Sequence, residues 1–130
     1  MRLLIALSLF LVLVVLACES TEAALQQNSP KEAAEGFLEA LKAEDFDLVE
    51  RYISASSKES LQNFRTNLNM ISEEERKTIL AAYKIPVETI NCLEKQGETR
   101  CNLTYQPEGE GMINLVQQEQ KWFVQMEFDY

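Results

Sequence analysis

The stretch that decides the fold is "VETINCLEKQGETRCNLTY", residues Val87 to Tyr105. On both sides of Gln96-Gly97, β-branched and apolar residues alternate with polar ones, which is the period of a half-buried β-strand. Glycine accepts the positive φ that two-residue hairpin turns require, so this dipeptide favours a tight turn. The stretch therefore predicts two antiparallel strands joined at Gln96-Gly97.

The register of this hairpin brings two cysteines together. Counting outward from a two-residue turn places Cys92 opposite Cys101 in a non-hydrogen-bonded pair, where Cα atoms lie about 4.5 Å apart. That spacing suits a disulfide, and Ile90 opposite Leu103 continues the same apolar face. We expect a Cys92–Cys101 disulfide that acts as a structural staple and contributes roughly 2.5–3 kcal/mol to stability.

The alternatives for the two cysteines are free thiols or a metal site. The chain has no histidine, and two sulfurs do not complete the ligand set of a zinc site. The spacing is also not that of a Cys-x-x-Cys redox motif. We expect no catalytic residue, no cofactor and no metal here.

A second hairpin follows after a loop from Pro107 to Gly111. Strands are predicted over residues 112–117 and 121–128, around a turn at Glu119-Gln120. The apolar side chains of the last strand share one face: Trp122, Val124, Met126 and Phe128.

The segment before Val87 has the pattern of four helices. Apolar residues recur every three or four positions, and short polar side chains stand where helices would begin. The expected N-caps are Ser29, Asp45, Ser56 and Ser72, and the three serines are each followed three residues later by a glutamate, as in a capping box: Glu32, Glu59 and Glu75. Helices followed by meandering antiparallel strands predict an α+β domain.

Two features of this half need a separate interpretation. The triplet Glu73-Glu74-Glu75 invites a metal site, but its place in a first helical turn is explained by the helix dipole, which favours anions there. Pro86 closes the helical half, because its ring disfavours a helical residue before it.

The N-terminus has the features of an export signal. Residues 3–17 are apolar apart from Ser8 and follow the single basic residue Arg2. Fifteen helical residues reach roughly 22 Å, short of the bilayer core of about 30 Å, whereas a secretory leader has this length and charge. The ending "VLAC", Val15 to Cys18, resembles the lipobox of bacterial lipoproteins.

That resemblance implies removal of the signal peptide 1–17 and acylation of Cys18, with palmitate-type chains that anchor the protein to a membrane. The alternatives are an uncleaved anchor and a protein secreted after cleavage elsewhere. In the sorting of Gram-negative lipoproteins that this signal resembles, an aspartate after the cysteine retains the protein in the inner membrane. Residue 19 is a glutamate, so we expect the outer membrane, facing the periplasm. We expect residues 18–28 to form a flexible tether and residues 29–130 to form one domain.

The charge of the chain excludes one class of partner. The formal net charge is −9, with 21 acidic and 12 basic residues. Such a surface repels polyanions, so nucleic acid is not an expected partner. The acids are spread along the chain, which is typical of a solvated surface.

Two further stretches resemble nuclear transport factor 2-like domains. The opening "SPKEAAEGFLEALKAEDFDLVERYIS" is similar to the first two helices of that superfamily, and "QEQKWFVQMEF" is similar to its closing hairpin. The resemblance extends from Ser29 to Tyr130, and small exported lipoproteins of unknown function share it. It implies a curved, cone-like antiparallel sheet around the long helix, whose open end holds a small molecule or supports a homodimer.

The chain departs from the enzymes of that superfamily because it lacks histidine. Only Glu88, expected on the face of Ile90 and Cys92, and Glu127, expected to be exposed, stand out among the acids. We therefore expect a lipid-anchored, non-catalytic protein of the cell envelope that binds a small molecule or an envelope protein. The alternatives are an isomerase or dehydratase of the superfamily type, and a structural subunit of an envelope complex.

Overall fold

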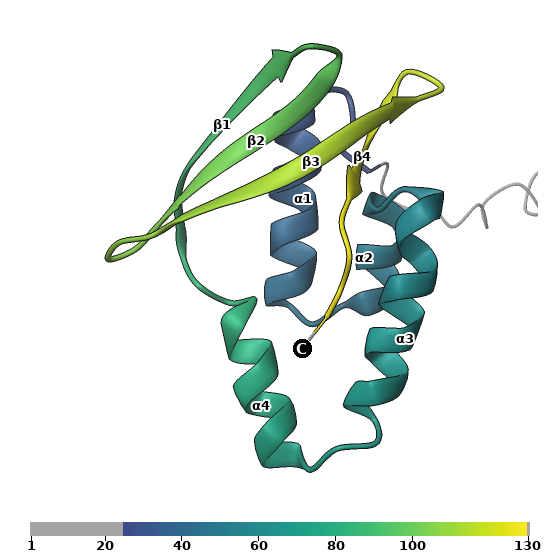
Figure 1. Cartoon of the computed structure of the whole chain (residues 1–130), viewed down its shortest axis with the longest axis vertical. Helices are drawn as coiled ribbons and strands as arrows, with labels where there is room; N and C mark the ends of the chain where they lie inside the picture. The colour runs from purple at the N-terminus through teal and green to yellow at the C-terminus, as the bar shows by residue number, and fades with distance from the viewer. Residues whose placement is uncertain (1–24, 130) are drawn as a thin grey trace, which may run out of the picture.

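Helices precede strands along the chain (Figure 1), as the sequence predicts. The computed structural model describes residues 25–129. The helical half comprises α1 (Pro30–Lys42), α2 (Phe46–Tyr52), the 3₁₀ helix η1 (Ala55–Ser57), α3 (Lys58–Leu68) and α4 (Glu73–Ala82). The strands are β1 (Val87–Lys95), β2 (Glu98–Tyr105), β3 (Glu110–Gln118) and β4 (Lys121–Gln125). The α+β class is confirmed.

Three of the four predicted N-caps are confirmed. The side chains of Ser29, Asp45 and Ser72 accept hydrogen bonds from backbone N–H groups of the first turns of α1, α2 and α4. Ser72 and Glu75 form a complete capping box, and the hydrogen bonds from Ser72 lower the pKa of the Glu75 carboxyl. These caps satisfy N–H groups that a helix cannot pair internally.

The predicted cap at Ser56 with Glu59 is wrong. The chain first makes the 3₁₀ turn η1, and α3 begins only at Lys58 without a side-chain cap. The Ser54 hydroxyl instead lies 3.0 Å from that of Ser56 and 3.1 Å from that of Ser57. Ser57 also makes a tertiary contact, which a local capping rule does not anticipate.

Ser57 and the nearby Ser60 hold the segment after β4 against the helices. The last strand stops at Gln125 rather than continuing to Phe128, and the segment after it runs along the helices. The hydroxyls of Ser57 and Ser60 accept hydrogen bonds from the backbone N–H groups of Met126 and Phe128. The Phe128 ring then packs against Phe37 and Phe64 in the core.

The four strands form an antiparallel meander in the order β1-β2-β3-β4. The predicted register of the first hairpin is confirmed from Lys95↔Glu98 back to Ile90↔Leu103. The turn residues Gln96 and Gly97 both have positive φ, as do Glu119 and Gln120 at the second hairpin. The β3 strand begins earlier than predicted, at Glu110, which shortens the loop before it.

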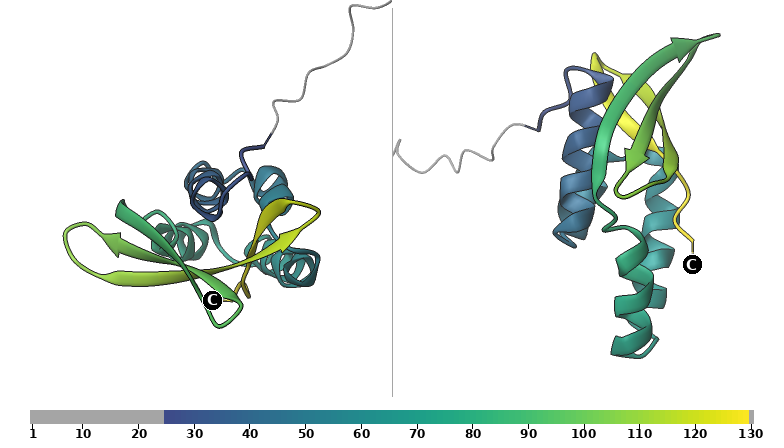
Figure 2. Two further views of the ribbon diagram at one scale, coloured as in Figure 1. Left: turned by 90° about the horizontal axis from the view of Figure 1, so that it is seen from above. Right: turned by 90° about the vertical axis from the view of Figure 1, so that its left-hand side faces the viewer.

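The core lies between the sheet and the helices (Figure 2), with α1 against one face of the sheet. The α4 helix extends beyond the end of the sheet (Figure 1). The largest fully buried side chains come from both layers: Phe37, Val49, Ile53, Leu61, Phe64, Leu68, Leu103 and Val124. Burial of these side chains, at about 1.5–3 kcal/mol each, holds the two layers together.

The two edges of the sheet differ. At the β4 edge, the Trp122 N–H donates to the Gln27 carbonyl at 3.0 Å, and the Ser54 N–H donates to the Val124 carbonyl at 2.8 Å. Gln27 is buried, and its side-chain amide also donates to the Trp122 carbonyl at 3.0 Å. The chain thus covers its last strand with its own extended segments, whereas within residues 25–129 no backbone group from another segment pairs with the outer edge of β1.

Candidate functional site

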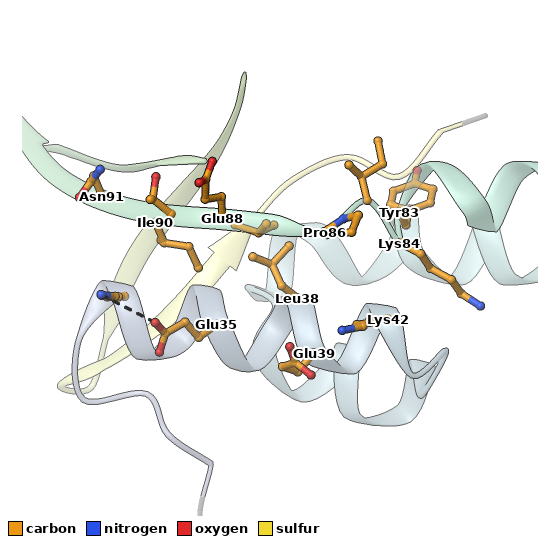
Figure 3. Close-up of a pocket in the computed structure, with 14 residues that line it drawn as sticks. Glu35, Leu38, Glu39, Lys42, Tyr83, Lys84, Pro86, Glu88, Ile90 and Asn91 are labelled. Carbon is orange, nitrogen blue, oxygen red and sulfur yellow. Dashed lines mark ion pairs between the residues drawn. The ribbon is translucent and has the colours of Figure 1, made fainter. Parts of the chain in front are cut away.

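A groove of about 680 Å³ lies between α1 and β1 and is closed at one end by the residues after α4 (Figure 3). We call it the α1–β1 groove. Its lining residues are Lys31, Glu35, Leu38, Glu39 and Lys42 from α1, then Tyr83, Lys84, Ile85 and Pro86, and finally Val87, Glu88, Thr89, Ile90 and Asn91 from β1. The volume is within the range of sites that bind small molecules.

The floor of the groove is aliphatic. Leu38 on α1 and Ile90 on β1 point toward each other across it (Figure 3), and both are partly buried against the core. Val87 adds a third partly buried side chain at the start of β1. A ligand that placed apolar groups on this floor would remove them from water at about 25 cal/mol per Å².

The rim of the groove is charged and nearly balanced. Lys31 pairs with Glu35 at 3.9 Å, and Lys84 pairs with Glu44 at 2.7 Å. The other charged lining residues, Glu39, Lys42 and Glu88, are exposed and form no ion pair with any described residue. Two carboxylates and one ammonium therefore remain for a ligand.

The closed end of the groove carries an aromatic side chain with a polar tip. Tyr83 packs edge-on against Phe64 with ring centroids 5.5 Å apart, and its hydroxyl donates to the Asp129 carbonyl at 2.9 Å. Burial, and secondarily the charge of Asp129, raises the pKa of the Tyr83 phenol. The adjacent Ile85 is 45% exposed and offers an apolar contact at this end.

The expected placement of Glu88 is wrong. The pairing of β1 with β2 shifts between Val87 and Thr89, so an irregularity in the strand changes which side chains face inward. Val87 packs against the core, and Glu88 lies exposed at the groove. A strict period of two cannot anticipate a β-bulge. Glu127 is exposed, as expected.

The predicted disulfide is confirmed. Cys92 and Cys101 are bonded across the first hairpin with their Cα atoms 3.9 Å apart, and Cys101 is completely buried. The described residues contain no group of three or more His, Cys, Asp or Glu side chains that could hold a metal ion. The bridge ties β1, which carries one wall of the groove, to the rest of the sheet.

The predicted lipidation site lies outside the described residues. Cys18, the signal peptide 1–17 and residues 18–24 of the tether belong to the part of the chain of which the structure says nothing. Among residues 25–129, no helix is long and apolar enough to cross a bilayer.

The groove itself was not predicted from the sequence. One signal was present, because the first strand of an open meander lies at an edge of the sheet. The position of α1 beneath that edge is a matter of tertiary packing, and no local pattern in the sequence encodes it.

Comparisons with known proteins add no relative. No protein-family profile, no curated protein and no solved structure matches this chain. The α+β architecture is therefore known from the structure alone.

Proposed function

We propose that this chain is a lipid-anchored protein of the bacterial cell envelope whose domain binds a partner, without catalysis, in the α1–β1 groove. The observation that carries the proposal is the groove itself, with its aliphatic floor and its charged rim. Concave surfaces are the usual places for ligands, and this one combines an aliphatic floor with mostly polar and charged residues around it.

The anchor rests on the N-terminal sequence. A short apolar leader ends in "VLAC", and Cys18 carries the acyl chains in this proposal. One acyl chain binds a membrane only marginally, but two or three hold a protein there stably. The Cys92–Cys101 disulfide supports export, because such bonds persist mainly in oxidising compartments. We place the protein on the outer membrane, facing the periplasm.

Binding is favoured over catalysis by the position of the charged groups. The carboxylates of Glu35, Glu39 and Glu88 are all exposed, and that of Glu88 points away from α1 on the other side of β1 (Figure 3). Enzymes obtain strong electrostatic effects in dry, enclosed sites where water is excluded. An open groove with exposed carboxylates suits recognition of a partner surface better than proton transfer.

We propose further that the domain is a small nuclear transport factor 2-like domain. The long helix α1 against one face of an antiparallel sheet supports this assignment. A fold of this type hosts many functions, so the assignment adds no substrate.

Site-specific photocrosslinking in cells tests the binding function. A photoreactive residue replaces Glu88 in the groove, and the matched control replaces Asn63, an exposed residue of α3. We expect a discrete crosslinked species from Glu88→p-benzoylphenylalanine and none from the Asn63 control. Absence of an adduct at position 88, or equal adducts at both positions, would refute binding at the groove.

A further inference from the structure

The outer edge of β1 presents backbone groups that the fold leaves unpaired. The close Cα spacing of Cys92 and Cys101 identifies them as a non-hydrogen-bonded pair. Residues in such positions direct their N–H and C=O groups away from the paired strand. Because this pattern repeats every two residues, the backbone N–H and C=O groups of Ile90, Cys92 and Glu94 point away from β2, toward the open edge of the sheet.

No described segment satisfies these groups. The β4 edge is sealed by Gln27 and Ser54 through direct hydrogen bonds, but the rest of the described chain sends no backbone or side-chain hydrogen bond to the outward groups of β1. Natural proteins usually blunt or cover an edge strand, because an open one is a template for another strand.

We infer that β1 accepts an extended segment of another polypeptide as a fifth strand, and that the α1–β1 groove receives its alternate side chains. The inference rests on the proposed binding function and specifies its mode. Backbone hydrogen bonds to Ile90, Cys92 and Glu94 would supply affinity, and the groove would supply specificity, as in other cases of strand addition.

The groove defines the chemistry of the added strand. Every second side chain of that strand would point to the helical side, over Leu38 and Ile90, so apolar residues belong at alternating positions. The unpaired rim charges, Glu39 and Glu88 against Lys42, favour a segment that is neutral or basic. A basic segment also complements the net charge of −9 of the chain.

A second copy of this chain is a poorer occupant. Two molecules of net charge −9 repel each other. The strand pairing is irregular near Glu88, and the side chains of Glu94 and Lys95 place charges at the other end of the edge, while the backbone groups from Ile90 to Glu94 stay available. Such features restrict edge-to-edge self-association and leave a short central stretch for a specific partner.

The disulfide prepares this edge for binding. It fastens β1 to β2 at the middle of the three outward residues. A strand held in its bound conformation loses less conformational entropy when a ligand pairs with it.

The test uses a library of random nine-residue peptides as the probe, selected against the full-length protein in detergent micelles. We expect enriched peptides with apolar residues at alternating positions and a neutral or positive charge. Each amide of an enriched peptide is then N-methylated in turn. Methylation on the side that faces β1 should weaken binding about tenfold, the value of one strong hydrogen bond, and methylation on the other side should have little effect.

Paired variants of the protein test the same hydrogen bonds. Ile90→Pro removes an outward N–H without removing a bond to β2, and Ile90→Ala is its matched control because it loses the side chain but keeps the N–H. Glu94→Pro and Glu94→Ala repeat the comparison at an exposed position, in case the first pair disturbs folding. At each position proline should bind the peptide about tenfold more weakly than alanine.

Several results would overturn the inference. In the peptide selection, they are enrichment no higher than with the Leu38→Glu variant, or binding that N-methylation does not change. In the protein variants, they are equal peptide affinities of the proline and alanine substitutions. Dimerisation of the free protein through β1 would also overturn it. If position 88 still gives a crosslink, any of these results would refute strand addition at β1 but not binding at the groove. Loss of that crosslink would remove both.

Discussion

The chain covers one edge of its sheet and leaves the other edge open. The last strand, β4, is covered by segments from far away in the sequence, Gln27 and the residues at the end of α2. The first strand, β1, is left open above a groove that α1 and the residues after α4 form with it. The fold therefore seals one edge as part of its core and leaves the other accessible to a partner.

The difference is also one of energetics. Val124 on β4 is completely buried, and Ile53 beside it is almost so. On β1 the largest apolar side chain of the outer face, Leu93, is 63% exposed. Substitutions of the buried residues of β4 should therefore cost stability, whereas substitutions of the exposed residues of β1, away from the disulfide, should leave the fold intact.

The largest expected effect breaks the sealed edge. Val124→Asp places a carboxylate in a completely buried position without a partner, and should lower the free energy of unfolding by about 4 kcal/mol. The control, Leu93→Asp on β1, should change it by less than about 0.5 kcal/mol. Urea unfolding of both variants makes the measurement, and equal losses would show that the two strands do not differ in this way.

Removal of the disulfide should have the next largest effect. The double variant Cys92→Ala and Cys101→Ala should lose roughly 2–3 kcal/mol, because the unfolded chain regains the freedom of the closed loop. Chemical denaturation under non-reducing conditions reports the loss. A double variant as stable as the wild-type protein would contradict the role of the bridge as a staple of β1.

A smaller effect tests the seal of β4 directly. Gln27→Ala removes the side-chain amide that donates to the Trp122 carbonyl, and should cost about 1 kcal/mol because that partly buried carbonyl loses a donor. Asn91→Ala, at an exposed amide on β1, is the control and should be nearly neutral. Thermal unfolding of both variants measures the difference. A Gln27→Ala variant as stable as the wild-type protein would mean that the backbone hydrogen bonds alone close this edge.

The smallest effect concerns the aromatic end of the groove and depends on pH. The pKa of Tyr83 is raised above its ordinary value of 10.0 in the folded protein. Above that pH the unfolded chain releases the phenolic proton while the folded chain keeps it, so this contribution to stability is complete below pH 10 and is lost as pH rises through the folded pKa. Tyr83→Phe should therefore lose less stability than the wild-type protein between pH 9 and pH 11, as measured by urea unfolding. An identical loss in both proteins would contradict the shift.

Much of the fold could be predicted from local sequence patterns. The hairpin turn at Gln96-Gly97, its register and the disulfide follow from a period of two and a two-residue turn. The caps at Ser29 and Ser72 follow from the need of a helix N-terminus for acceptors. These features depend only on neighbouring residues, and local rules describe such cases well.

Most of the predictions that failed concern contacts between distant parts of the chain. Ser57 and Ser60 bind the backbone of the C-terminal segment, which no capping rule contains. The irregularity near Glu88 lets Val87 pack inward, and a prediction based on strict alternation of side chains cannot include it. The α1–β1 groove depends on where α1 packs, so the candidate site could not be found before the fold was known.

Amide hydrogen exchange resolved by residue tests the contrast between the two edges most directly. In the free, full-length protein in detergent micelles, we expect fast exchange at Ile90, Cys92 and Glu94, whose N–H groups face outward from β1, and slow exchange at Ser54 and Trp122, which pair across the β4 edge. Slow exchange at all three outward amides of β1 would mean that this edge is already covered, and would contradict the account of it as an open site for a partner.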